Sequence, residues 1–334
     1  MNIYDIAKLA GVSIATVSRV VNDSAKVSGK TRAKVLGVME EVGYIPNIFA
    51  RGLGLNSMRT IGILCPDISD IYMANAVSYL EKNLNKHGYD CILGCSGHRQ
   101  EEKEKYIKLL LSKRIDTLVL VGSTYAGKGD NPAETEYLRL AAKETPIFMI
   151  NAYVPGENIY CAYADDFQAA YEVTAAYIRR GKKRILFLSN ARSFSGDQKR
   201  AGYEKALIDN AYPVDGALIF YSEHSIHDTR DMLLLNKKLE FDGVLATEDS
   251  LAIAAVKYAK TKNLAIPAEL SVVGFNNSRL SICCEPELTT IDNKGEILCA
   301  VTVEQMISLL EEKVQPKEKI SVPCEIIKRN TTDF

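Results

Sequence analysis

The sequence predicts an α/β protein in which a small helical head precedes doubly wound parallel sheets. From residue 60 onward, short β-rich runs alternate with helical stretches, as in parallel strands joined by crossover helices. Three short amphipathic segments lie before residue 60, and residues 1–59 carry a net charge of +4, whereas the rest of the 334-residue chain carries −5. A basic head on an acidic body indicates that the head meets a polyanion.

The head is expected to contain three helices. The stretch IYDIAKLAG ends at Gly11, and VSIATVSRVVN then begins with Ser13 as an N-cap. The third helix, SGKTRAKVLGVMEEVG, begins after Ser28. The residues expected to form a small core are Ile3, Ile6, Ala7, Ala10, Val17, Val20, Val21, Val35, Met39 and Val42. Two helices around a glycine-containing turn suit insertion of the second into the DNA major groove, although a head for protein contacts shares this pattern.

The stretch PNIFARGLGLNSMRT combines helix-forming and apolar residues with Gly52 and Gly54. Each glycine inside a helix costs about 0.5–1 kcal/mol relative to alanine. The segment is too short for a stable isolated helix and too apolar for a solvated linker. It is therefore expected to become helical only when a partner supports it.

The body is expected to bind its ligand at the carboxyl ends of its strands. The expected strands are TIGILCP, DCILGC, DTLVLVGS, PIFMIN, RILFLS, GVLAT and LSVVGF. The expected helices are MANAVSYLEKNLNKHG, KEKYIKLLLSKR, DFQAAYEVTAAYIRRG, DQKRAGYEKALIDN and EDSLAIAAVKYAKTKN. The loops that follow the strands supply the candidate ligand-binding residues Asp70, Tyr72, Asn151, Lys199, Arg200, Glu248 and Asn276. Carboxylates and amides around an aromatic ring suit a polyol such as a sugar, a sugar phosphate or a nucleoside.

These stretches carry a family resemblance. Residues 3–47 closely resemble the DNA-binding head of the lactose/galactose repressor (LacI) family, and the body adds GILCPDISDIY, GYEKAL, IPAELSVVGFNNSRL and PELTTI. The resemblance implies a homodimeric transcriptional regulator with a body of periplasmic-binding-protein type. It implies a helix-turn-helix domain at 1–46, a hinge helix at 47–59, an N-terminal subdomain at 60–160 and 291–320, and a C-terminal subdomain at 161–290 and 321–334.

The resemblance also assigns roles to single residues. Ile14 and Ala15 match the variable specificity pair, while Thr16, Ser18, Arg19 and Asn22 match positions that touch base edges or phosphates. Ser13 and Tyr4 complete the expected DNA-binding set, with Tyr4 as a phosphate contact or a packing residue. In the hinge, Leu53 matches the leucine that wedges into a central base step, and Ala50 matches the position where two hinges pack together. The expected operator is a pseudopalindrome in double-stranded DNA.

Several positions depart from the family pattern. The usual GFDD is GFNN, so Asn276 replaces an aspartate that often grips the ligand. Lys199 stands where arginine is common, and Glu248 stands where asparagine is frequent. Gly54 replaces an expected alanine in the hinge. These changes leave the identity of the effector open.

Other function classes are less well supported. The sequence contains no GxxxxGK[ST], H-E-x-x-H or G-x-S-x-G motif, so no enzyme activity, metal or cofactor is expected. A uniform apolar run of membrane-spanning length is also missing, and the eight cysteines form no C-x-x-C pair, which together favour a cytoplasmic protein without a membrane partner. Two alternatives remain: a regulator controlled by a protein co-repressor, and a cytoplasmic sugar-binding protein.

Overall fold

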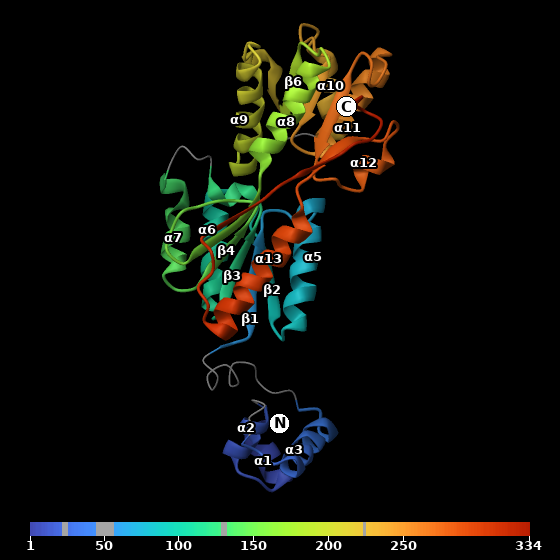
Figure 1. Ribbon diagram of the computed structural model, residues 1–334. Helices are drawn as coiled ribbons and strands as arrows, with labels where there is room; N and C mark the ends of the chain where they lie inside the picture. Colours follow the sequence, from blue (N-terminus) through green and yellow to red (C-terminus); the bar gives the residue numbers. More distant parts are fainter. Residues whose placement is uncertain (22–25, 45–56, 128–131, 223–224) are drawn as a thin grey trace.

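The computed structural model describes residues 1–21, 26–44, 57–127, 132–222 and 225–334. Figure 1 shows a helical head and a body built from two α/β subdomains. The expected hinge helix, with Ala50 and Leu53, lies outside the described residues, as does Asn22. In the described parts of the chain, no helix is both long enough and apolar enough to cross a membrane.

The head is a bundle of α1 (Ile3–Ala10), α2 (Ile14–Val21) and α3 (Gly29–Glu41). Asn2 caps α1, and Gly11 ends this helix with the left-handed φ of 59° that glycine adopts without strain. The predicted caps of α2 and α3 are confirmed, because the backbone N–H groups of Thr16 and Thr31 donate to the hydroxyls of Ser13 and Ser28. The predicted core residues are buried or half-buried.

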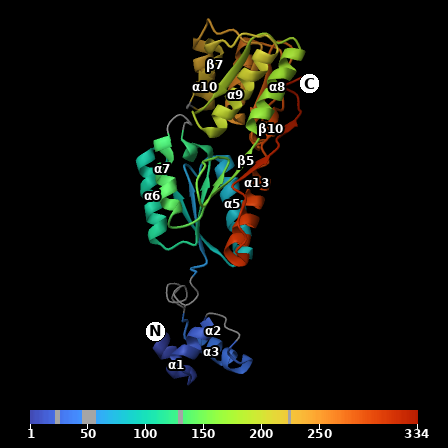
Figure 2. The same cartoon turned by 60° about the vertical axis from the view of Figure 1, so that its left-hand side comes forward.

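The N-terminal subdomain is built around one parallel sheet with the strand order β11-β5-β4-β3-β1-β2. Its strands are β1 (Thr60–Cys65), β2 (Asp90–Cys95), β3 (Thr117–Val121), β4 (Ile147–Ile150), β5 (Ile159–Ala164) and β11 (Lys319–Val322). Its helices are α5 (Ile71–Lys86), α6 (Gln100–Ser112), α7 (Glu136–Ala142) and α13 (Gly295–Ile307), with shorter turns at η1 (Ser123–Ala126), η2 (Pro132–Thr135) and η4 (Ser308–Glu312). Helices α5 and α13 cover one face, and α6 and α7 cover the other (Figure 2).

The C-terminal subdomain repeats this plan with the strand order β12-β10-β9-β8-β6-β7. Its strands are β6 (Ile185–Ser189), β7 (Ile219–Tyr221), β8 (Gly243–Ala246), β9 (Ser271–Phe275), β10 (Thr289–Asp292) and β12 (Glu325–Ile327). Its helices are α8 (Asp166–Arg179), α9 (Phe194–Asp209), α10 (Ile226–Leu235), α11 (Asp249–Lys262) and α12 (Leu280–Cys283), with a turn at η3 (Gly216–Leu218). Helices α8 and α9 pack on one face, and α10 and α11 pack on the other.

The described chain crosses between the two sheets three times. The crossings follow β5, β10 and β11, at residues 165, 293–294 and 323–324. Each lies a few residues beyond the expected boundaries near 160, 290 and 320. The reason is strand pairing, because residues 161–164 pair with β11, residues 291–292 belong to the C-terminal sheet, and residues 321–322 pair with β5.

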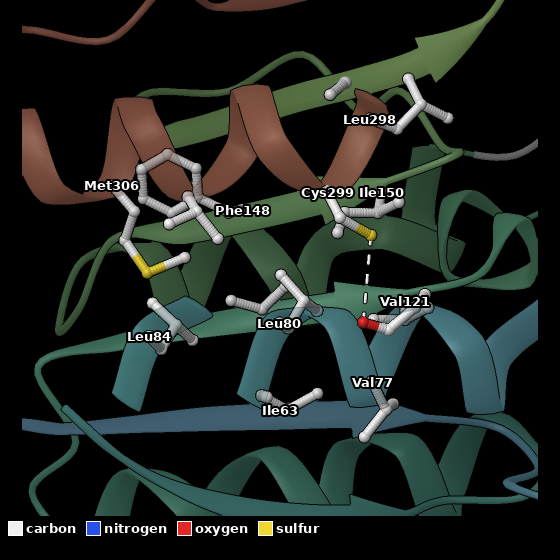
Figure 3. Close-up of a cluster of buried hydrophobic side chains, with 14 of the residues drawn as sticks. Ile63, Val77, Leu80, Leu84, Val121, Phe148, Ile150, Leu298, Cys299 and Met306 are labelled. Carbon is white, nitrogen blue, oxygen red and sulfur yellow. Dashed lines mark hydrogen bonds between the residues drawn. The ribbon is translucent and has the colours of Figure 1, made fainter. Parts of the chain in front are cut away.

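In the core of the N-terminal subdomain, helix α13 packs against helix α5. Figure 3 shows Leu298 and Met306 of α13 in the same buried cluster as Leu80 and Leu84 of α5. The Cys299 thiol lies 3.9 Å from the carbonyl oxygen of Ala76, so the two helices are in close contact. Segments more than two hundred residues apart therefore form one layer.

All seven predicted strands and all five predicted body helices are confirmed, with small shifts at their ends. Five further strands (β5, β7, β10, β11 and β12) and the helices α7, α10, α12 and α13 were not predicted. The seven predicted strands are parallel as expected, and the unpredicted β12 adds an antiparallel edge through its pairing with β10. All eight cysteines are free thiols, and Cys283 is exposed.

A test of the packing uses Gly202 of α9, which lies against α8. A methyl group at this position would come within 2.1 Å of the Phe167 carbonyl oxygen, a backbone atom that cannot move without shifting α8. Gly202→Ala is expected to lower the free energy of unfolding by about 1–3 kcal/mol in denaturant titrations. The control is Gly216→Ala, because no atom lies within 4 Å of an added methyl there. Equal stability of the two variants would contradict this account of the α8–α9 contact.

Candidate DNA-binding surface and effector cleft

Helix α2 divides its side chains between the head core and solvent. Val17 and Val20 are buried, whereas Ile14, Ala15 and Arg19 are exposed. Ile14 and Ala15 lie in the first turn, the end of a recognition helix that meets base edges, and Arg19 lies in the last turn. The guanidinium of Arg19 offers a donor fork of the kind that pairs with guanine, whereas Ile14 and Ala15 offer only apolar contacts.

The other predicted DNA-binding residues surround this face. The hydroxyls of Ser13 and Thr16 lie 2.9 Å apart, so they orient each other at the start of α2. Ser18 is half-buried, and Tyr4 is 66% exposed on α1. Every described residue of the predicted DNA-binding set therefore reaches the surface of the head at least in part.

A cleft of about 880 Å³ lies between the subdomains. The N-terminal subdomain contributes its lining through the start of α5 and of α13, and the C-terminal subdomain through the loops after β8 and β9. Of the predicted effector-binding residues, Asp70, Tyr72, Glu248 and Asn276 line it. Asn151, Lys199 and Arg200 are not part of its lining.

Asp70 and Tyr72 begin helix α5 at the cleft. Asp70 caps the helix, because its Oδ1 accepts a 2.9 Å hydrogen bond from the backbone N–H of Met73. The Tyr72 ring packs on Gly295, where an added methyl would lie 3.2 Å from the ring. The Tyr72 hydroxyl is buried without a hydrogen-bond partner, and this burial raises its pKa well above the ordinary value.

Lys199 is buried inside the C-terminal subdomain. Its Nζ donates to the Thr247 carbonyl oxygen at 3.2 Å and lies 4.1 Å from the centre of the Phe275 ring. It also lies 3.9 Å from Oδ1 of Asp166, and the side chains of this pair are 5% and 1% exposed. Burial raises the pKa of Asp166, and the charge of Lys199 opposes this shift. The positive charge of Lys199 therefore partly offsets the cost of burying the Asp166 carboxylate.

Glu248 and Asn276 face the cleft from the C-terminal subdomain. Glu248 accepts a hydrogen bond from Nδ2 of Asn190 at 2.9 Å and another from the Ser250 hydroxyl. Burial raises the pKa of Glu248, and the charge of Asp70 across the cleft adds to the shift. Asn276 has a positive φ of 90°, and its Oδ1 accepts from Nδ2 of Asn293 at 3.0 Å.

The remaining two predicted residues lie elsewhere. Asn151 follows β4, is 7% exposed, and its Oδ1 has no hydrogen-bond partner. Arg200 is not brought to the cleft, because its guanidinium binds Glu204 at 2.7 Å and approaches the Tyr221 hydroxyl at 3.5 Å. Lys199 and Arg200 are neighbours on one helix, so only one of them could face the subdomain interior.

Sequence reasoning did not single out Asp166 in this region. Asp166 is held by the Ser195 hydroxyl at 2.5 Å and is the ion-pair partner of Lys199. The pair of acidic residues directly after the apolar run of β5 is a sequence signal that could have pointed to it. Asp249 lines the cleft, but its carboxylate is occupied by Thr290 and by the hydroxyl and N–H of Ser278.

Two contacts hold the subdomains together beside the cleft. The Ser123 hydroxyl after β3 donates to the Ser193 hydroxyl at 3.0 Å. Next to it, the Phe194 ring from the C-terminal subdomain lies 5.4 Å from Tyr163 and 6.5 Å from Tyr153. We call Phe194, Tyr163 and Tyr153 the aromatic clasp.

Comparisons with known proteins agree with this architecture. The profile of bacterial regulatory proteins of the lacI family matches residues 2–47. The profile of periplasmic binding proteins and the sugar-binding domain of the LacI family matches residues 58–330. Together the two profiles cover the head and nearly the whole body.

Relatives and solved structures match over nearly the entire chain. An HTH-type transcriptional regulator of Lachnoclostridium phytofermentans is 48% identical over 338 residues, covering 100% of both proteins. The lac repressor dimer bound to operator and the anti-inducer ONPF has a TM-score of 0.85 at 24% identity, covering 99% of this chain and 98% of that one. The transcriptional regulator CelR in complex with cellobiose has a TM-score of 0.71 at 21% identity, covering 99% and 100%. At these identities the two structures show a shared fold, while the profiles and the relative establish that the chain belongs to the LacI family of transcriptional regulators.

Proposed function

We propose that the protein is a cytoplasmic homodimeric repressor, with no enzyme activity, that binds a pseudopalindromic operator through two copies of the head. The observation that carries this proposal is the exposed face of α2, where Ile14, Ala15 and Arg19 project from a head that buries Val17 and Val20. The net charge of +4 on residues 1–59 supports binding to a polyanion. The lac repressor structure, a dimer on its operator, supports the stoichiometry.

The body is proposed to control operator affinity through a small polar ligand in the cleft. The CelR–cellobiose complex supports a sugar or sugar derivative as the ligand class. A ligand that contacts both Asp70 and Glu248 would draw the subdomains together, because these residues lie on opposite sides of the cleft. The movement would change the spacing of the two hinge segments in the dimer, with a coupling of typically about 1–3 kcal/mol.

Selection of bound duplexes from a random library by the full-length protein tests the proposal. Enrichment of an inverted repeat at near-physiological salt is expected, because two heads of one dimer read the same half-site in opposite directions. Enrichment of a single half-site would contradict the dimeric reading. Binding without any enriched sequence, with or without added metabolites, would contradict sequence-specific regulation.

Arg19→Ala is expected to relax specificity at one base pair of each half-site. The loss of a bidentate contact to guanine costs about 1–3 kcal/mol of discrimination. Competition binding with single-base variants of the selected operator measures this loss of discrimination. Arg180→Ala, on the surface of the body, serves as the control. Uniform weakening on all duplexes would instead identify Arg19 as a phosphate contact.

Leu53→Ala is expected to remove most operator-specific binding, because the hinge would lose the side chain proposed to wedge into the central base step. Non-specific, salt-sensitive binding by the heads should remain. Fluorescence anisotropy with operator and scrambled duplexes at several salt concentrations separates the two modes. Leu235→Ala, at a leucine that is 80% exposed in the body, is the matched control. Unchanged operator affinity of Leu53→Ala would refute the hinge assignment.

A further inference from the structure

The chain enters the body beside the start of β1, at the end of the N-terminal sheet opposite the cleft (Figure 1). Residues 57–59, which we call the hinge exit, lie here. Asp116, directly before β3, holds the backbone of this segment. Its two carboxylate oxygens accept hydrogen bonds from the N–H groups of Met58 at 3.1 Å and of Thr60 at 2.8 Å. The path of the chain at the hinge exit is therefore fixed by a side chain of the body.

The side chain of Arg59 adds a second anchor. Its Nη1 donates to the His87 carbonyl oxygen at 2.9 Å and lies 3.4 Å from Oε1 of Glu311. The guanidinium carbon lies 4.9 Å from the centre of the buried Tyr89 ring. Arg59 also has a left-handed φ of 47°, which residues other than glycine rarely adopt. Such a backbone persists where the surrounding contacts determine it, as they do here.

The partners of Arg59 belong to the two helices that line the cleft at their other ends. His87 is the C-cap of α5, and the start of α5 at Asp70 lines the cleft. Glu311 lies in η4, which continues α13 directly, and the start of α13 at Gly295 lines the cleft. An arginine beside the end of α5 also satisfies a carbonyl group that the helix leaves without an internal partner.

Helices α5 and α13 also pack against each other along their length. The Cys299 thiol meets the Ala76 carbonyl oxygen near the cleft, and Met306 shares the buried cluster with Leu84 closer to the hinge exit. Packed helices are rigid elements, so a displacement at one end is carried to the other. Movement at the cleft ends of these helices therefore reaches the groups that hold Arg59.

We propose that Arg59 is a positioning residue that ties the hinge exit to both cleft-lining helices, and that operator-specific affinity depends on this tie. The inference rests on the proposed function, because the hinge segment acts only in a protein that binds an operator. An anchored exit presents the hinge segment at a defined place, so less freedom is lost when DNA binds. The side chains of Arg59 and Glu311 are 44% and 38% exposed, so their ion pair contributes little to folding stability.

The competing role for Arg59 is direct contact with DNA phosphate. The two roles make opposite predictions for Glu311. If charge alone matters, removing this carboxylate strengthens the attraction to DNA, because a negative group near a polyanion is lost. If Arg59 positions the hinge exit, the same change weakens operator binding, because an anchor of Arg59 is lost.

Fluorescence anisotropy of the full-length protein with the library-selected operator and a scrambled duplex, at one salt concentration, tests the inference. Arg59→Gln is expected to weaken operator binding about fivefold or more, the lower end of typical allosteric coupling. Glu311→Gln should weaken it by a smaller factor, because Arg59 keeps its contacts with His87 and Tyr89. The double variant should bind no more weakly than Arg59→Gln, since both changes remove one contact. Arg59→Lys, which keeps a cation for the same partners, should restore most of the affinity.

Two control variants separate positioning from charge. Glu312→Gln removes the same charge from the exposed neighbour of Glu311 and should not weaken operator binding. Arg114→Gln removes an exposed arginine just before β3, at the same end of the sheet, and measures the effect of one lost positive charge. The loss in Arg59→Gln should exceed that in Arg114→Gln on the operator but match it on the scrambled duplex. Denaturant titrations check that all variants fold.

Each contrary outcome overturns a definite part of the account. Operator binding by Glu311→Gln that equals or exceeds wild type, with equal losses of Arg59→Gln on both duplexes, would identify Arg59 as a phosphate contact instead. Unchanged operator affinity of Arg59→Gln, or additive losses in the double variant, would also overturn the tie. In each of these cases sequence-specific binding by the wild type would leave the regulator assignment intact. Absence of sequence-specific binding by the wild type would overturn the proposed function and this inference with it.

Discussion

The rest of the structure depends on one constraint: two sheets of mostly parallel strands face each other with their carboxyl ends, and three crossing segments join them. Parallel strands place their following loops at one edge, so the polar residues of each subdomain gather where the other subdomain covers them. The crossings leave each subdomain with packed cores of its own. The cleft, its buried carboxylates and the aromatic clasp all follow from this arrangement.

Carboxylates are buried at the cleft and in the C-terminal subdomain next to it. The buried carboxylates of Asp166 and Glu248 have raised pKa values because burial disfavours their charged forms. The positive charge of Lys199 lies next to Asp166, whereas Glu248 faces the carboxylate of Asp70 across the cleft. The aromatic clasp joins the subdomains through residues that do not line the cleft.

Much of the fold could be predicted from the sequence, because the confirmed strands are apolar runs bounded by turn residues and the head helices have caps and clear faces. The unpredicted strands carry weaker signals: β7 and β12 have three residues each, and β11 is largely exposed. Helix α13 lacks a regular polar face, so the spacing of its apolar residues does not show a helical period. In the site, the spacing of the loops located Asp70, Tyr72, Glu248 and Asn276. The burial of Lys199 against Asp166 arises from packing between distant segments, which no local pattern encodes.

The most direct test of the central claim, that the cleft controls operator affinity, needs no ligand. Glu248→Lys would reverse the charge that faces Asp70 across the cleft. The account predicts a change in operator affinity of about fivefold or more relative to wild type, the lower end of typical allosteric coupling, measured by fluorescence anisotropy at fixed salt. Glu144→Lys makes the same change in net charge away from the cleft and should leave that affinity unaltered. Identical operator affinity of Glu248→Lys and wild type would contradict the account.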